Sequence, residues 1–310
     1  MSNANSAYAV RVLGTENYKG RDDGWYGDCI IIYDAQNKEM VVYDCGSEQH
    51  ADEVVKFMNA NGIAETSVIL SHNDSDHFDG IPKLIQSGKV GNIFTTLLLQ
   101  HIDEIFGKFD DDRRTEDATK EHILELYSNI AELSGESLKD IYGDESALPS
   151  GITFIGPDKD TMFKVVAKAI EENDLQSKEG KETLVNSTSL QIEIPLRDGK
   201  KMLLLGDADV GNVTCKLDDY KYIQLPHHGK KESAEAVFDK VTDNFANHTF
   251  FISDNTGSSN GGSDELMASP EIIKGKEIKN TKTGNLDLGG VPTFKTITDA
   301  RKDYGICGGI

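Results

Sequence analysis

The sequence has few of the features that mark membrane-bound, secreted or disulfide-stabilised proteins. No stretch approaches the ~18 consecutive apolar residues that a membrane span requires. Residues 1–7 lack the basic segment and the apolar core of a secretory signal. The four cysteines are scattered without the spacing of a metal or redox motif. These absences predict a protein without membrane association, with reduced and buried cysteines, located in the cytoplasm.

Basic residues are also scarce. The 310 residues include 32 lysines and arginines against 53 aspartates and glutamates, which gives a formal net charge of −21. A broad footprint on duplex nucleic acid or an anionic membrane needs clustered lysine and arginine, so the charge argues against both. A small or single-stranded phosphoester substrate is still compatible with this charge, because bound metal ions reverse the field locally.

Apolar runs of strand length occur in two groups, each interleaved with helical periodicity. The first group predicts strands at 7–13, 29–33, 40–43, 66–70 and 93–99. The second predicts strands at 152–155, 189–194, 202–205, 222–225 and 249–253, with one more at 293–297. Helices are expected at 51–61 and 162–172, and a loop at 174–182. Mixed sheets covered by helices are the simplest packing for this pattern, which predicts an α/β protein.

A polar, helical block at about 100–148 has too few apolar positions for a core of its own. We interpret it as an insertion or lid within a single domain that spans residues 1–310. An exposed surface element without a function is an equally supported interpretation of this block. Its acidic surface makes it a candidate site for a protein partner.

The most informative segment follows the strand expected at 66–70. His72, Asp74, Asp76 and His77 place four potential metal ligands within six residues. Imidazole and carboxylate together suit zinc, manganese or iron. The structural alternative is a polar turn in which an aspartate caps a helix. Because neighbouring side chains on a tight loop point in different directions, this segment predicts two adjacent metal sites.

Two later strands end in residues of the same kind. Asp207 follows the strand at 202–205, and His227 and His228 follow the strand at 222–225. Ligands at the ends of neighbouring strands converge on one rim of a sheet. We therefore expect these residues to meet the segment 72–77 at one site.

In this order the motifs resemble the metallo-β-lactamase superfamily. The nearest resemblance is to its ComEC-like branch, the hydrolase domain of bacterial DNA-uptake channel proteins, and it covers about residues 8–300. The motifs that carry it lie at 24–28, 43–46, 72–77, 186–190, 205–207 and 226–229. The chain departs from the branch at 268–270, where Ala-Ser-Pro replaces Gly-His-Pro. The resemblance implies an αββα sandwich of mixed sheets, here with a helical insertion, and two divalent metal ions, zinc or manganese.

The resemblance also implies roles for individual residues. The implied metal ligands are His72, Asp74, Asp76, His77, Asp207, His227 and His228. Of these, Asp76, Asp207 and His228 are the implied catalytic residues, although His228 could instead lie behind the ligands. Candidates for orienting the ligands or contacting substrate are Asp28, Asp44, Asn186, Thr188, Ser189 and Lys230.

The function favoured by the sequence is a metal-dependent phosphodiesterase or nuclease-like hydrolase that uses a metal-bridging hydroxide. One alternative is a hydrolase of a carbonyl substrate such as a lactone, β-lactam or thioester. Such members usually keep histidine at the position of Asp74. Another alternative is a non-catalytic, metal-binding interaction protein, and the complete ligand set argues against it.

Overall fold

The structure is a computed structural model that describes residues 8–14, 27–109, 115–126, 128–133, 137–143, 147–172, 178–179, 182–254 and 262–290. Residues 24–26 of the first motif and the strand expected at 293–297 lie outside these ranges. No helix within the described ranges is long and apolar enough to cross a membrane.

Within the described residues, the first sheet has seven strands in the order β15-β1-β2-β3-β4-β5-β6. These strands are β1 (Ala9–Val12), β2 (Ile30–Asp34), β3 (Glu39–Tyr43), β4 (Thr66–Ile69), β5 (Val90–Thr95), β6 (Leu138–Asp140) and β15 (Leu286–Leu288). The pairs from β15 to β3 are antiparallel, and those from β3 to β6 are parallel. The sheet is therefore mixed, as expected.

The second sheet, in the same described ranges, has six strands in the order β14-β13-β12-β11-β10-β7. They are β7 (Thr153–Gly156), β10 (Gln191–Pro195), β11 (Lys201–Leu204), β12 (Tyr222–Gln224), β13 (Thr249–Ile252) and β14 (Ile278–Asn280). Strands β11 to β14 are parallel, whereas β7 and β10 are antiparallel to their neighbours. A separate pair, β8 (Lys178–Glu179) and β9 (Glu182–Thr183), lies where a loop was expected.

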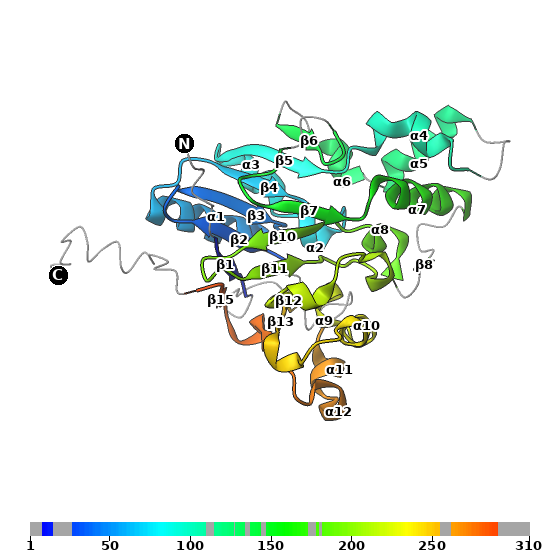
Figure 1. Cartoon of the computed structure of the whole chain (residues 1–310). Helices are drawn as coiled ribbons and strands as arrows, with labels where there is room; N and C mark the ends of the chain where they lie inside the picture. The colour runs from blue at the N-terminus through cyan, green and yellow to red at the C-terminus, as the bar shows by residue number, and fades with distance from the viewer. Residues whose placement is uncertain are drawn as a thin grey trace, which may run out of the picture.

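Helices connect and cover these sheets. They are α1 (Glu48–Asn61), α2 (Ser75–Phe78), α3 (Ile81–Gln86), α4 (Ile102–Phe106), α5 (Glu116–Leu126), α6 (Ser128–Glu132), α7 (Lys159–Glu172), α8 (Leu184–Ser187), α9 (Pro226–Gly229), α10 (Lys231–Lys240), α11 (Asp264–Met267) and α12 (Pro270–Ile273). Short 3₁₀ turns are η1 (Leu98–His101), η2 (Val210–Asn212), η3 (Leu217–Asp219), η4 (Phe245–Asn247) and η5 (Thr281–Thr283). Figure 1 shows α1 and α3 beside the first sheet, and α10 to α12 on the opposite side of the molecule beside the second.

Strand β11 shows how the layers form. Successive side chains of a strand point to opposite faces of its sheet. Met202 and Leu204 belong to the core shared with the first sheet, whereas Leu203 belongs to a second cluster that includes Val237 of α10. Val54 of α1 packs in the first core. The two mixed sheets thus face each other with helices outside each, which is the expected αββα sandwich.

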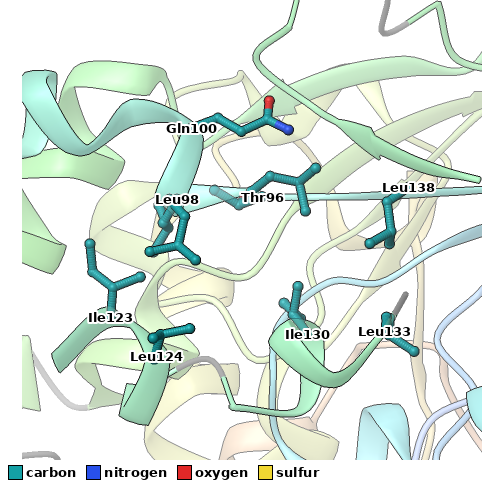
Figure 2. Close-up of a pocket in the computed structure, with 10 residues that line it drawn as sticks. Thr96, Leu98, Gln100, Ile123, Leu124, Ile130, Leu133 and Leu138 are labelled. Atoms are coloured by element: carbon teal, nitrogen blue, oxygen red, sulfur yellow. The ribbon is translucent and has the colours of Figure 1, made fainter. Parts of the chain in front are cut away.

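The insertion does not need a core of its own, because its apolar residues join the core of the sandwich. Ile105, Ile123 and Ile130 are buried there, and Leu98, Ile123 and Ile130 line a cavity (Figure 2). The insertion is not wholly helical, since β6 extends the first sheet. The strand expected at 93–99 ends earlier because the backbone N–H of Leu97 donates to the Asp140 carboxylate, 2.9 Å away, and η1 follows.

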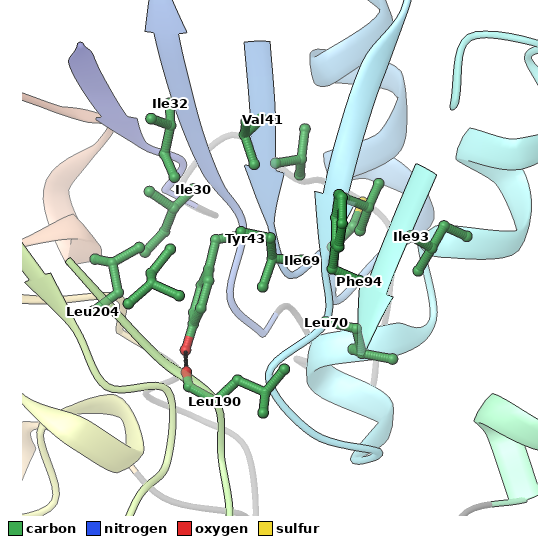
Figure 3. Close-up of a cluster of buried hydrophobic side chains, with 14 of the residues drawn as sticks. Ile30, Ile32, Val41, Tyr43, Ile69, Leu70, Ile93, Phe94, Leu190 and Leu204 are labelled. Carbon is green, nitrogen blue, oxygen red and sulfur yellow. Dashed lines mark hydrogen bonds between the residues drawn. The ribbon is translucent and has the colours of Figure 1, made fainter. Parts of the chain in front are cut away.

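The two sheets are also joined by a hydrogen bond. Tyr43, at the end of β3, extends between the sheets among apolar side chains such as Ile30 and Leu204 (Figure 3). Its hydroxyl donates to the carbonyl oxygen of Leu190, 2.6 Å away. Burial raises the pKa of Tyr43, so this hydroxyl stays protonated as the donor. The contact fixes one sheet against the other next to the strand ends that carry the site.

Candidate metal centre

The candidate site lies at the carboxyl ends of parallel strands from both sheets. Asp44 follows β3, the segment 72–77 follows β4, Asp207 follows β11, and His228 follows β12. Asp28 joins them because β2 runs antiparallel to β3, with Ile30 paired to Tyr43, which places the start of β2 beside the end of β3. Ligand sites in α/β proteins form at such strand ends.

Asp44 and His77 form the first carboxylate–histidine pair. Oδ2 of Asp44 lies 2.8 Å from Nδ1 of His77. The same carboxylate accepts hydrogen bonds from the Ser71 backbone N–H and hydroxyl, each 2.7 Å long. Nε2 of His77 then lies 3.4 Å from Oδ1 of Asp207. The pair is completely buried, so the carboxylate fixes which ring nitrogen of His77 faces the site.

Asp28 and His228 form the second pair. Nδ1 of His228 lies 3.1 Å from Oδ1 of Asp28. Its Nε2 lies 3.1 Å from Oδ2 of Asp76 and 3.7 Å from Oδ2 of Asp207. Gln224 donates from Nε2 to Oδ2 of Asp28 over 2.8 Å, while its Oε1 accepts from the backbone that leads to Asp207. Both pairs therefore direct an Nε2 atom toward Asp207.

His72 enters from the loop after β4. Its Nδ1 lies 2.9 Å from the Ser71 hydroxyl and 3.1 Å from the Ser189 hydroxyl. Its Nε2 lies 3.6 Å from Oδ2 of Asp74. The side chain of Asp74 is 39% exposed, whereas that of His72 is 1% exposed. Asp74 therefore marks the solvent side of the site.

The remaining predicted residues lie around this group. Asn186 donates from Nδ2 to Oδ2 of Asp207 at 3.3 Å, and Nε2 of His227 lies 4.0 Å from the same oxygen. Thr188 is buried in the turn before β10. Lys230 links α9 to α10, and its backbone N–H donates to the carbonyl of His227 over 2.9 Å.

The backbone at the site is strained. Asp44, His227 and His228 have φ values of 57°, 52° and 53°, in the left-handed region that non-glycine residues rarely adopt. Such conformations cluster at functional sites, where surrounding structure holds them in place. Here they place the Asp44 carboxylate beside His77, and the imidazoles of His227 and His228 near Asp207.

Charges at the site stabilise one another strongly. Burial alone would lower the pKa values of His77 and His228, but nearby Asp207 raises both well above the ordinary value, assisted by Asp44 and Asp28 respectively. Burial would raise the pKa of Asp207, but the charges of His228 and His77 hold it well below the ordinary value. Without a metal ion, protons on the imidazoles therefore balance the buried carboxylate.

The donor atoms fit a divalent metal ion. One ligand atom each from Asp28, His77, Asp207 and His228 falls within 4.8 Å of the others. Among the described residues, Nε2 of His72, Nε2 of His77 and Oδ1 of Asp207 are buried atoms that make no hydrogen bond. A buried polar atom without a partner is costly. A cation bound within the group of four would give His77 and Asp207 a partner, and imidazole with carboxylate suits zinc or manganese.

Two contributors at this site were not predicted from the sequence. Gln224 holds Asp28 in place, and Ser71 holds both Asp44 and His72. The sequence does carry a signal for Gln224, because it is a polar residue within the apolar strand at 222–225. Ser71 had a similar signal, as a hydroxyl residue between a buried strand and the first ligand.

No protein-family model and no curated protein matches the chain. Among solved structures, it is similar to the metallo-β-lactamase fold protein YhfI from Bacillus subtilis, with 13% identity and a TM-score of 0.43 over 90% of this chain and 100% of that one. It is also similar to a mutant of CmlA β-hydroxylase, with 9% identity and a TM-score of 0.45 over 91% of this chain and 54% of that one. A metallo-β-lactamase from Cronobacter sakazakii gives 12% identity and a TM-score of 0.31 over 69% and 66% of the two chains. At these identities, the chemistry has to be inferred from the site itself.

Proposed function

We propose that the protein is a metal-dependent hydrolase of the metallo-β-lactamase superfamily and that its substrate is a phosphodiester. The observation that carries the proposal is the pair of buried carboxylate–histidine contacts, Asp44 with His77 and Asp28 with His228, whose Nε2 atoms both face Asp207. Metal-binding histidines almost always donate their other ring N–H to such a partner.

The residues that would hold the metal are the predicted set. They are His72, Asp74, Asp76, His77, Asp207, His227 and His228. Two divalent ions bound there would lower the pKa of a water molecule and polarise the oxygens of the group under attack.

The protein supplies orientation and charge. Ser71 and Ser189 fix the ring of His72, so that its Nε2 faces Asp74 at the solvent side. Asn186 holds one oxygen of Asp207 in place. These contacts fix the donor atoms before substrate arrives, which reduces the reorganisation needed during the reaction.

A phosphodiester is favoured over a carbonyl substrate by the ligand set. Asp74, in place of the histidine usual in carbonyl hydrolases of the family, makes the set richer in oxygen. The net charge of −21 favours a small or single-stranded substrate over a duplex. Asp74 is partly exposed, so substrate reaches the site from its side.

The test is hydrolysis of bis(4-nitrophenyl) phosphate by protein stripped of metal and then refilled with zinc or manganese. We expect turnover that requires metal and is lost in Asp207→Ala. Asp198→Ala, at an exposed aspartate on the turn after β10, is the matched control and should retain full activity. Metal-loaded wild type that leaves this diester intact but cleaves 4-nitrophenyl acetate would overturn the phosphodiester assignment.

A further inference from the structure

A cavity lies next to the loop that carries the predicted ligands at 72–77. It has a volume of about 230 Å³ and opens between the end of β5, η1 and the helices α5 and α6 (Figure 2). Six of the side chains that line it are Leu98, Leu99, Ile123, Leu124, Ile130 and Leu138.

The lining is aliphatic and uncharged. Of the ten lining residues, which all lie in the described ranges, Thr96 and Gln100 are the ones with polar side chains. In Figure 2, Gln100 lies at the edge of the group, away from Leu124 and Ile130. Leu99 and Leu124 are large apolar side chains that are 43% and 44% exposed. Such a pocket, apolar inside and open to solvent, fits an uncharged aliphatic group rather than an anion.

The wall of this cavity is bonded to the metal loop. Asn73, between His72 and Asp74, accepts a hydrogen bond at Oδ1 from the backbone N–H of Ile130, 3.1 Å away. Its own carbonyl accepts from Nδ2 of Asn129 over 2.9 Å. The helix α6 that lines the cavity is therefore attached directly to the segment that carries the predicted ligands. The cavity wall at Ile130 thus lies one hydrogen bond away from the loop between His72 and Asp74.

We propose that this cavity binds the aliphatic chain of the substrate, so that the enzyme acts on alkyl phosphodiesters; this rests on the proposed function. A dry apolar cavity of about 150 Å³ in another protein accommodates benzene, so the present volume suits a chain of roughly six to eight carbons. Each buried methylene strengthens binding by roughly three- to fourfold. The chain would contribute affinity, while metal ions held by the predicted ligands would polarise the phosphoryl group.

The test uses a series of alkyl 4-nitrophenyl phosphates, from methyl to decyl, with metal-loaded protein. In the reaction water adds to phosphorus, the P–O bond to 4-nitrophenolate breaks, and alkyl monophosphate forms as the protons of water pass to solvent. We expect kcat/KM to rise roughly three- to fourfold for each methylene up to about octyl and then to level off. Equal kcat/KM values for the methyl and octyl esters would overturn the proposal.

Variants of the cavity locate the effect. Leu124→Glu places a charge at its exposed rim, and Leu133→Trp fills part of its volume. Both should reduce the octyl preference at least tenfold while changing methyl ester turnover little. Ile85→Glu and Met267→Glu alter exposed apolar residues that do not line this cavity, and should keep the preference. An unchanged preference in both cavity variants would also reject the assignment.

Calorimetry separates the two proposals. Binding of octyl phosphate and methyl phosphate to metal-loaded wild type is measured directly, without turnover. If no ester is hydrolysed but octyl phosphate binds at least tenfold more tightly than methyl phosphate, and Leu124→Glu abolishes the difference, the cavity assignment stands and the hydrolase assignment fails. If esters are hydrolysed without chain preference, the hydrolase assignment stands and the cavity assignment fails.

Discussion

Gly27 packs directly against the carbonyl oxygen of Asp76, so closely that a Cβ atom at Gly27 would lie 1.5 Å from that oxygen. A Cβ atom at Gly46 would likewise lie 1.8 Å from the same oxygen. The backbone N–H of Asp28 donates to this carbonyl over 2.8 Å. The glycines beside Asp28 and Asp44 therefore let two loops close on the metal loop and bring both carboxylates to their histidines.

The first prediction concerns this contact. Gly27→Ala should destabilise the protein by about 3 kcal/mol or more, because the clash is with backbone and cannot be relieved by a side-chain rotation. Gly88→Ala is the control, since Gly88 has a φ of 69° and nothing within 4 Å of its Cβ position. It should cost only about 1 kcal/mol, for the left-handed backbone alone. Urea unfolding measures both, and equal losses would show that the contact with Asp76 is unimportant.

The second prediction concerns the two carboxylates behind the histidines. Asp44→Asn and Asp28→Asn keep the side-chain size but remove the negative charge that orients His77 and His228. Each should weaken zinc or manganese binding by about 10- to 100-fold, the usual effect of losing such a partner. Asp287→Asn, at an aspartate paired with Arg11 away from the site, should leave affinity unchanged. Titration against a competing chelator measures the affinities; unaltered binding in both site variants would contradict the orienting role.

Much of this site could be predicted from the sequence, because ligands that follow apolar strands carry a local signal. The segment 72–77, Asp207 and His228 each stand next to such a run, and the structure brings them together at one edge. The contact of Gln224 with Asp28 could not be predicted, since it joins residues 196 positions apart. The early end of β5 was also missed, because the carboxylate that stops it, Asp140, comes from the distant strand β6.

The third prediction is a pH dependence of stability. His50, in the first turn of α1, is fully buried, and burial lowers its pKa to about 3. The unfolded chain binds a proton at this residue below about pH 6.5, whereas the folded protein does not until about pH 3. Stability therefore falls as the pH drops through this window, by about 1.4 kcal/mol per pH unit.

His50→Leu removes this titration. Between pH 7.5 and pH 5, the wild type should lose about 2 kcal/mol more than the variant does. Denaturant unfolding of both proteins at each pH gives the difference, in which the titration of all other groups cancels. Parallel pH profiles would show that the His50 imidazole is as easily protonated in the folded protein as in the unfolded chain.

The last prediction concerns the attachment of the insertion to the metal loop. Asn73→Ala removes the oxygen that accepts from the buried backbone N–H of Ile130, which should cost about 1–3 kcal/mol. The loss should be local, so amide hydrogen exchange should accelerate in α5 and α6 while α1 keeps its protection. Asn73→Asp retains an acceptor of the same shape, so exchange in α6 should stay close to that of the wild type. Metal affinity should fall severalfold in Asn73→Ala, because the residue stands between His72 and Asp74. Exchange that accelerates throughout the chain, or that does not accelerate in α6, would mean that this contact does not hold the insertion against the site.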